Sequence, residues 1–332
     1  MGRILHSVSY KATFKRGASE MGIDKLLNIL TEEFGEYVVR GEELKKHTTF
    51  KIGGAAYVFV KVQNVRMLKR VVRLCADFGV PIRVLGAGSN LIVSSDGICD
   101  SVVLSLDALN QIKRCGKTHV RVGAGVRLTR LKEYCEVMGL SGLEWSAGIP
   151  ASLGGAVFMN AGAFCGDMGK IVHSVKILAN GKIRKIKHDK LFFNYRDSVF
   201  KRSLDCVIIE ARLRLKKSNA STVKKTGEDY LKRRLSSQRV GYPSAGSVFK
   251  RVGSEVVPAR VIDVLGLKGM RVGDAEISKV HAGYIVNTGN ATSRDVTELI
   301  KLVQQIVFNK LNIGLQVEVI IWENDICNQK KR

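Results

Sequence analysis

A glycine-rich stretch at residues 142–169, GLEWSAGIPASLGGAVFMNAGAFCGDMG, restricts what this chain can fold into more than any other part of its sequence. Its glycines alternate with other small residues and with the hydroxyls of Ser146 and Ser152, so its backbone can approach another molecule closely. A phosphate-binding loop requires such a close approach, because its backbone N–H groups face the anion. Pro150 suits the first turn of a short helix whose N-terminus points at a ligand. A tight turn with a small-residue packing surface explains the same composition equally well.

The length and charge of the chain limit the classes of protein to which it can belong. With 332 residues, 45% of them hydrophobic, it can form two or three domains with sizeable cores. Its 54 lysines and arginines outnumber 30 aspartates and glutamates, and the formal charge of +24 attracts anions. The basic residues are spread along the whole chain, and no nucleic-acid-binding motif accompanies them. Small anionic ligands or a generally basic proteome therefore explain the charge as well as a polynucleotide does.

Cysteine usage and the length of the apolar runs indicate the environment of the chain. Seven cysteines without a Cys-x-x-Cys pair or metal-ligand spacing favour a reducing cytosol and argue against a metal site. The longest apolar runs are strand-sized, well short of the roughly 20 residues that cross a bilayer. Residues 1–19 are basic, contain no acidic residue and lack the apolar stretch of a secretory signal. We therefore expect residues 1–23 to form a disordered basic arm rather than a transit peptide.

The first glycine loop of the chain lies before this stretch and follows a strand predicted at residues 81–85. It reads Gly-Ala-Gly-Ser-Asn-Leu from Gly86 to Leu91 and begins like a dinucleotide-binding fingerprint. The third glycine is missing, and residues 91–93 predict a strand where a Rossmann fold needs a helix. We therefore reject a Rossmann fold. A glycine loop between two strands can still present N–H groups to a pyrophosphate.

Local patterns predict the other elements. Asn180-Gly181 indicates a β-hairpin between residues 172–178 and 181–186. The basic, serine- and threonine-rich run 216–225 has no apolar periodicity and indicates a domain boundary. Thr292 is the expected N-cap of the last helix. Helical spacing of apolar residues is present in five segments, which are 24–34, 65–78, 128–138, 228–235 and 257–265.

Three polar side chains stand out as candidates for chemistry, and each has a plain structural alternative. Arg196, among aromatic residues, is either a packed surface residue or a two-pronged clamp for a carboxylate. Ser247 lies in a small, polar loop with no histidine or aspartate nearby, so a serine hydrolase is disfavoured. Glu318 lies in a strand predicted at 315–322, on the face opposite Val317 and Val319. It is either exposed or held for chemistry.

Several of these motifs, taken in their order along the chain, resemble the UDP-N-acetylenolpyruvoylglucosamine reductase family, flavoenzymes of peptidoglycan precursor synthesis. Several motifs in one order are far more specific than any single motif. The resemblance runs from about residue 48 to about residue 322 and leaves out the N-terminal arm. The matching segments are 49–54, 86–91, 148–162, 195–201, 243–250, 266–269 and 281–287.

The resemblance implies an α+β fold. A two-subdomain FAD-binding fold of the vanillyl-alcohol-oxidase/p-cresol-methylhydroxylase type would cover residues 24–215, with subdomains at about 24–85 and 86–215. A C-terminal α+β substrate-binding domain would cover 226–325. The implied activity is the reduction of UDP-N-acetylglucosamine enolpyruvate to UDP-N-acetylmuramate in the cytoplasm, with non-covalent FAD as cofactor and NADPH as co-substrate. The implied partners are these small molecules, with no nucleic acid and no membrane, and the protein would be a monomer.

The resemblance also implies roles for individual residues. Ser247 matches the proton donor, and Arg196 and Glu318 match the pair that stabilises the enolic intermediate. The residues expected to contact FAD belong to the glycine loops. They are Gly53, Gly86, Ala87, Gly88, Ser89, Asn90, Leu91, Gly148, Ile149, Pro150, Ser152, Gly154, Gly155, Asn160, Ala161 and Gly162.

Two positions depart from the family pattern. Asp274 stands where the family commonly has glycine, and Ile321-Trp322 stands where its last strand continues as Ile-Gly. The chain also lacks the tyrosine-bearing insertion of the longer subclass, which places it in the shorter one. Another flavin-dependent oxidoreductase of the same FAD-binding superfamily is the alternative enzyme. A basic nucleic-acid-binding protein is the alternative from another class, and it would be colourless.

Overall fold

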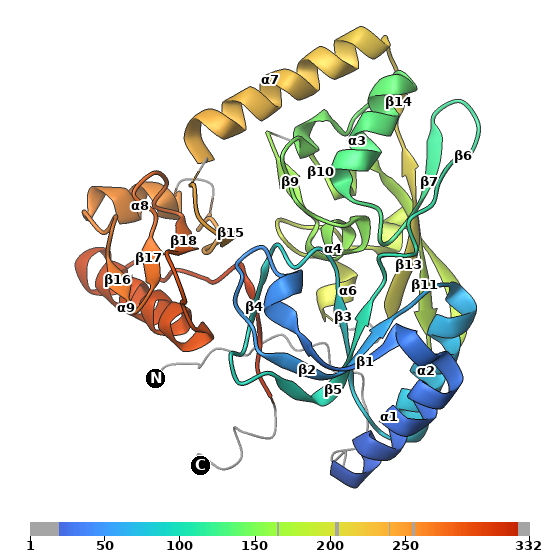
Figure 1. Cartoon of the computed structure of the whole chain (residues 1–332). Helices are drawn as coiled ribbons and strands as arrows, with labels where there is room; N and C mark the ends of the chain where they lie inside the picture. The colour runs from blue at the N-terminus through green and yellow to red at the C-terminus, as the bar shows by residue number, and fades with distance from the viewer. Residues whose placement is uncertain (1–19, 165, 203–205, 239, 254–255, 325–332) are drawn as a thin grey trace.

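The computed structural model describes residues 20–164, 166–202, 206–238, 240–253 and 256–324, which form three larger sheets, three two-stranded sheets and the helices around them (Figure 1). The mixture of helices and strands is the α+β class expected from the sequence. Helix α1 (Glu20–Phe34) begins before residue 24, so the last residues of the expected basic arm, 20–23, are helical. Residues 1–19 of that arm lie outside the described residues.

The first sheet has the order β1-β2-β5-β3 and is covered on one face by α1 and α2 (Val65–Asp77). Its central strands β2 (Ala55–Lys61), β5 (Ile98–Ser105) and β3 (Ile82–Leu85) are parallel, whereas β1 (Val38–Glu43) runs antiparallel to β2. Alternate residues of the central part of β2 enter two cores. Val58 and Val60 face the helices, whereas Phe59 faces a smaller core that also holds Trp322.

The second sheet is a five-stranded antiparallel sheet of order β12-β11-β13-β7-β6. Its strands are β6 (Ile112–Arg114), β7 (His119–Gly123), β11 (Val172–Ala179), β12 (Lys182–Lys187) and β13 (Val207–Arg214). The predicted hairpin joins β11 to β12. Asn180 and Gly181 have φ values of 48° and 69°, the left-handed pair that such a two-residue turn requires. Helix α3 (Leu128–Val137) is the predicted helix 128–138.

The third sheet, of order β15-β18-β17-β16, forms the C-terminal part together with α8 (Pro258–Val264) and α9 (Ser293–Leu311). Its strands are β15 (Ser244–Ser247), β16 (Arg271–Val272), β17 (Ala275–Ile277) and β18 (Tyr284–Asn287). Thr292 caps α9 as predicted, in a capping box with Asp295. The buried face of α9 is formed by Val296, Leu299, Ile300, Val303 and Val307.

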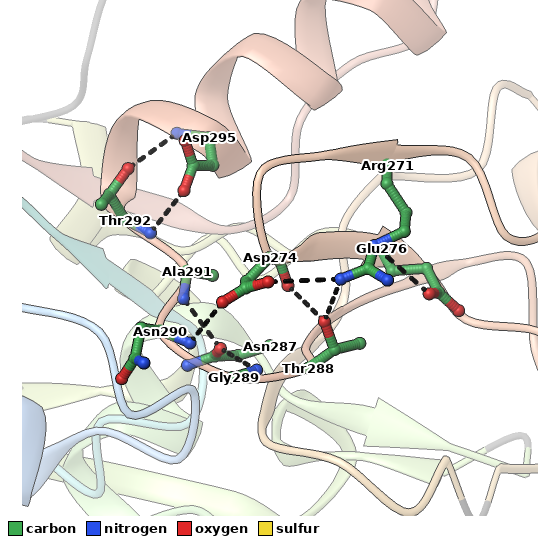
Figure 2. A network of polar contacts seen from close by, with 10 residues as sticks. All are labelled: Arg271, Asp274, Glu276, Asn287, Thr288, Gly289, Asn290, Ala291, Thr292 and Asp295. Atoms are coloured by element: carbon green, nitrogen blue, oxygen red, sulfur yellow. Dashed lines mark hydrogen bonds and ion pairs between the residues drawn. The ribbon is translucent and has the colours of Figure 1, made fainter.

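A polar network fixes the turn before α9 against the β16–β17 hairpin (Figure 2). Asp274 accepts a 2.8 Å hydrogen bond from the backbone N–H of Asn290, and its other carboxylate oxygen lies 3.3 Å from the Arg271 guanidinium. Arg271 also donates to the Thr288 hydroxyl at 2.8 Å. The aspartate that departs from the family pattern is therefore an anchor of this turn.

Helix α7 (Ala220–Gln238) differs from the prediction, which had an irregular boundary at 216–225 and a helix only at 228–235. It crosses one side of the molecule toward the C-terminal part (Figure 1). Only Val223 and Gly227 are buried along it. Because the helix touches its neighbours through so narrow a strip, the sequence shows no apolar periodicity over its first half.

The end of the chain returns from the C-terminal part to the first glycine loop. Strand β19 (Ile320–Trp322) pairs in parallel with β4 (Leu91–Val93), directly after that loop. The predicted strand 315–322 is thus regular only at its end, with a single bridge from Val317 to Phe249 before it. The predicted alternation is correct, since Leu315 and Val319 enter the C-terminal core and Trp322 the other core.

Candidate active site

A cavity of about 840 Å³ is lined by segments from all three larger sheets and their connections. Its volume is within the size range of small-molecule sites. It is lined by the first glycine loop, by part of residues 148–164, by the loop that contains β15, and by Glu318. All the residues expected to contact FAD line it, except Gly53 and Asn160. The three expected catalytic residues, Arg196, Ser247 and Glu318, line it as well. The structure therefore gathers segments that are far apart in the sequence around one space.

The first glycine loop connects β3 to β4, so a strand follows the glycines, as predicted. A Cβ at Gly86 would lie 2.6 Å from Ser152 Oγ, and one at Gly88, whose φ is +61°, would lie 2.0 Å from the carbonyl oxygen of His47. Close packing therefore requires both glycines. In the described part of the chain, the backbone N–H groups of Ala87, Gly88 and Ser89 have no hydrogen-bond partner. They can serve an anionic ligand.

The second glycine region is built differently from the prediction. Helix α4 (Leu153–Met159) begins after its N-cap Ser152, so Pro150 precedes the cap and is not in the first turn. The N–H groups of Leu153 and Gly154 donate to the carbonyls of Val126 and Ala124, at 2.8 Å each. Because the neighbouring segment occupies these donors, the first turn of α4 does not offer them to a ligand. A Cβ at Gly154 would lie 3.1 Å from Ala124 Cβ, so this glycine packs closely, whereas one at Gly155 would meet only Ser152 Oγ at 3.4 Å; both glycines line the cavity.

Gly53 and Asn160 stand outside the cavity and hold loops in place. Gly53 packs against Val93 with a φ of +136°. Asn160 ends α4 in the left-handed region, accepts a 2.8 Å bond from the N–H of Gly169 and donates one of 2.8 Å to the carbonyl of Asn194.

Arg196 sits at the tip of a tight turn. Asn194 and Asp197 exchange backbone hydrogen bonds of 3.0 and 3.1 Å, and Arg196 between them has a φ of 52°. A positive φ in a residue other than glycine costs roughly 1–3 kcal/mol and is commonly kept where it aims a functional side chain. Here Arg196 Nε donates to Glu318 Oε1 at 2.7 Å, and Nη2 donates to the carbonyl of Gly162 at 2.9 Å. Both arms of the guanidinium are therefore fixed.

Glu318 is not an exposed carboxylate, because it is paired with Arg196 and largely buried. Its side chain is 12% exposed. Burial raises its pKa above the ordinary value of 4.5, and the positive charges of Arg196, Lys250 and Lys201 act in the opposite direction. Its backbone N–H donates to the carbonyl of Val248 at 2.7 Å, which ties it to the β15 loop.

Ser247 ends β15 and is exposed toward the cavity. It is paired across the strands with Tyr284 of β18, so the two side chains lie on the same face. The structure thus brings a hydroxyl, a guanidinium and a carboxylate to one cavity.

The sequence did not single out two further cavity residues on α7, Arg234 and Gln238. Arg234 donates to the carbonyl of Ala147 at 2.9 Å and to Gln238 Oε1 at 3.0 Å. Burial lowers the pKa of Arg234 below its ordinary value, and none of its hydrogen-bond acceptors is a carboxylate. Arg234 lies within the helix predicted at 228–235, whereas Gln238 lies beyond its predicted end and joins the same helix face only because α7 extends to Gln238. Together with Arg196 and Arg251, Arg234 makes the cavity suited to a ligand with several negative charges.

Other properties of the described ranges bear on the class of protein. No helix among them has the length and apolar character that a bilayer-spanning segment requires. Within the same ranges, no three side chains of histidine, cysteine, aspartate or glutamate are grouped to hold a metal ion.

Comparisons with known proteins agree on the two parts of the molecule. Residues 56–187 match the family model described as FAD binding domain, and residues 238–322 match the one described as UDP-N-acetylenolpyruvoylglucosamine reductase, C-terminal domain. These matches confirm the predicted fold class.

Relatives with the same description cover most of the chain. The UDP-N-acetylenolpyruvoylglucosamine reductase of Thermotoga sp. (strain RQ2) is 43% identical over 283 residues, which are 85% of this chain and 93% of that protein. The one from Syntrophomonas wolfei is 38% identical over 86% of this chain and 94% of its own. The crystal structure of UDP-N-acetylenolpyruvylglucosamine reductase from Thermus caldophilus superposes with a TM-score of 0.75 at 35% identity, covering 86% of this chain and 99% of that one.

Proposed function

This chain belongs to the UDP-N-acetylenolpyruvoylglucosamine reductase family, and on that premise we propose that it reduces UDP-N-acetylglucosamine enolpyruvate to UDP-N-acetylmuramate with NADPH as the reductant. It is an oxidoreductase of peptidoglycan synthesis with an FAD-binding domain. The reductant and the roles of individual residues are the parts that this proposal adds.

The first glycine loop fits the diphosphate of FAD. The N–H groups of Ala87, Gly88 and Ser89 are free of partners in the described chain, and Gly86 and Gly88 leave no room for a Cβ beside them. A row of such donors is a common anion site. FAD, when bound there, supplies a ring that accepts a hydride from NADPH and delivers it to the β-carbon of the enolpyruvyl group.

Arg196 and Glu318 would stabilise charge on the substrate. Adding a hydride to the enolpyruvyl group moves negative charge onto its carboxylate. A guanidinium at that carboxylate therefore interacts more strongly in the transition state than in the ground state, which is what lowers a barrier. The ion pair with Glu318 and the bond to Gly162 hold the guanidinium in one orientation. It does not have to reorganise during the reaction.

Ser247 would donate the proton that completes the reduction. The intermediate with charge on its carboxylate is basic enough at the α-carbon for a hydroxyl to protonate it. This chemistry needs a serine but no catalytic triad. The sequence around Ser247 and its place on the cavity wall fit that role.

A single observation carries the proposal: Ser247, Arg196 and Glu318 line the cavity that also holds the first glycine loop. We also propose that residues 24–215 form the FAD-binding part of the protein and residues 226–325 the substrate-binding part. We also include in the proposal that the protein works as a monomer in the cytoplasm, without nucleic acid or membrane.

Anaerobic mixing tests the proposal. The FAD-loaded protein is reduced with NADPH and then mixed with UDP-N-acetylglucosamine enolpyruvate while flavin absorbance is followed. We expect rapid reoxidation and formation of UDP-N-acetylmuramate, and no reoxidation with UDP-N-acetylglucosamine, which lacks the enolpyruvyl group. Flavin that stays reduced would favour another substrate and hence another flavin-dependent oxidoreductase. A colourless protein with steeply salt-dependent polynucleotide binding would favour the nucleic-acid alternative.

A further inference from the structure

Tyr284, the cross-strand partner of Ser247, belongs to a polar chain that leads to α7. Ser247 and Tyr284 are direct partners in the β15–β18 pair, and both line the cavity. The Tyr284 hydroxyl donates to Gln238 Oε1 at 3.1 Å, and Arg234 donates to the same oxygen at 3.0 Å. Ser247 therefore lies beside a chain of hydrogen bonds that joins Tyr284, Gln238 and Arg234.

A serine that donates its proton to carbon becomes an alkoxide, the conjugate base of a very weak acid. It needs a neighbouring donor to stabilise it and a source from which to regain its proton before the next turnover. Tyrosine, with an ordinary pKa of about 10, is a far stronger acid than serine. Within the described residues, Tyr284 is the cross-strand partner of Ser247 and carries such a donor.

We propose that Tyr284 is a positioning residue that acts through Ser247, holding its hydroxyl toward the cavity and returning a proton to its oxygen after each turnover. This inference rests on the function proposed above. The protons balance over one cycle. One passes from Ser247 Oγ to the α-carbon of the substrate as the C–H bond forms. One passes from Tyr284 Oη to Ser247 Oγ, and one from water to Tyr284 Oη after the product leaves.

The charges around the phenol are compatible with this role. Burial is the main influence and raises its pKa above 10.0, whereas the Arg234 guanidinium and the Ser247 hydroxyl lower it. The Glu318 carboxylate, also within range, raises it. His281 lies edge-on to the tyrosine ring with 5.0 Å between the ring centroids. Burial lowers the pKa of His281, which favours a neutral imidazole. Arg234 is thus the group that would stabilise a transient phenolate.

The test separates the two half-reactions in four proteins: wild type, Tyr284→Phe, Ser247→Ala and the double variant. We expect Tyr284→Phe to bind FAD and to be reduced by NADPH at the wild-type rate. Its reoxidation by UDP-N-acetylglucosamine enolpyruvate should slow by roughly 10-fold, less than the 10²–10⁴-fold of a direct proton donor. In the Ser247→Ala background the same substitution should have no further effect, because Tyr284 acts through Ser247. The solvent deuterium isotope effect on reoxidation should also decrease.

Tyr37→Phe is the matched control, since Tyr37 lies in the short helix η1 (Gly35–Tyr37) and does not line the cavity. Both of its half-reactions should stay at the wild-type rate. The inference would be overturned if the flavin of Tyr284→Phe were reoxidised by substrate at the wild-type rate. It would also be overturned if Tyr284→Phe slowed reoxidation equally in the wild-type and Ser247→Ala backgrounds. If the wild-type protein itself is not reoxidised by the substrate, the proposed function fails, and this inference fails with it.

Discussion

Arg196 Nε lies 2.7 Å from Glu318 Oε1, although 122 positions separate the two residues in the sequence. Arg196 comes from a tight turn beside the second sheet, whereas Glu318 lies between the C-terminal core and β19. The contact therefore forms only when the C-terminal part and the FAD-binding part are assembled. The orientation of Arg196 in the site therefore depends on how the C-terminal part is placed against the FAD-binding part.

Arg196→Lys should impair the enzyme although it keeps the charge. Lysine cannot make the bond to Glu318 and the bond to Gly162 in the same planar geometry. We expect reoxidation of the reduced flavin by substrate to slow by roughly 100-fold, the scale seen when one oriented charge-stabilising donor is lost. Reduction by NADPH should change much less.

Arg202→Lys is the control for that substitution. Arg202 pairs with Asp197 in the same region, and its side chain is 49% exposed. Surface ion pairs of this kind contribute little, so both half-reactions should be unchanged. Near-normal turnover of Arg196→Lys would show that Arg196 is not a carboxylate clamp.

Ser247→Ala should separate the two halves of the reaction most clearly. The side chain is exposed to the cavity, so its removal leaves no buried gap and the fold should be unaffected. We expect NADPH to reduce the flavin normally and the substrate to reoxidise it about 10²–10⁴-fold more slowly. Stopped-flow absorbance measures both steps. An equal loss in both halves would remove Ser247 from the proton-donor role.

The raised pKa of Glu318 should appear in the pH dependence of both activity and stability. Its folded-state pKa is above 4.5, so the folded protein binds this proton more tightly than the unfolded chain does. The contribution of the group to stability is thus fully present below the unfolded pKa and is lost as the pH rises through the folded pKa. Substrate-dependent reoxidation should decline on acidification through that folded pKa, where the carboxylate becomes protonated.

Glu318→Gln tests both effects. The acidic limb of the reoxidation rate should disappear, together with most of the rate. The change in melting temperature across the same pH range should also be smaller than in the wild type. An unchanged acidic limb would assign it to a group other than Glu318.

Gly86→Ala should weaken flavin binding. The new Cβ would lie 2.6 Å from Ser152 Oγ, so either the glycine loop or the cap of α4 must move. Because the N–H groups of the next residues are the proposed diphosphate site, we expect the dissociation constant of FAD to rise at least tenfold, or about 1.4 kcal/mol. Flavin titration measures it. Gly314→Ala, where a Cβ meets nothing within 4 Å, is the control and should bind FAD normally.

The sequence predicted best those features that depend on neighbouring residues. The Asn180-Gly181 turn and the Thr292 cap are chemical properties of four or five consecutive positions, and both are present. The first turn of α4 was predicted wrongly, because its N–H donors are taken by carbonyls of residues 124 and 126, which local sequence does not reveal. Likewise, Tyr284 gains its place in the site only from its strand pairing with Ser247.

The same limit applies to the catalytic trio. Nothing in the local sequence indicates that Arg196 contacts Glu318, and the pattern around Glu318 fitted an exposed carboxylate as well as a functional one. The family resemblance suggested these roles, since it compares whole chains and so includes contacts that are distant in sequence. Helix α7 was half missed for a physical reason of the same kind, because only Val223 and Gly227 are buried along it.

Asp274→Ala should destabilise the C-terminal part without affecting the site. Asp274 joins the β16–β17 hairpin to the turn before α9, through the N–H of Asn290 and the guanidinium of Arg271 (Figure 2). Losing the acceptor of a backbone N–H costs on the order of 1 kcal/mol. The midpoint of chemical unfolding should fall accordingly, whereas FAD affinity should not change, because Asp274 does not line the cavity.

Glu298→Ala provides the comparison, since Glu298 is exposed on α9 and its side chain makes no hydrogen bond or ion pair in the described chain. Its unfolding midpoint should equal that of the wild type. A glycine at position 274, as is common in the family, cannot accept the Asn290 N–H through a side chain, so Asp274→Gly should lose at least as much stability as Asp274→Ala. Equal midpoints for Asp274→Ala and Glu298→Ala would mean that the turn is held by the Thr288 and Asn287 contacts alone.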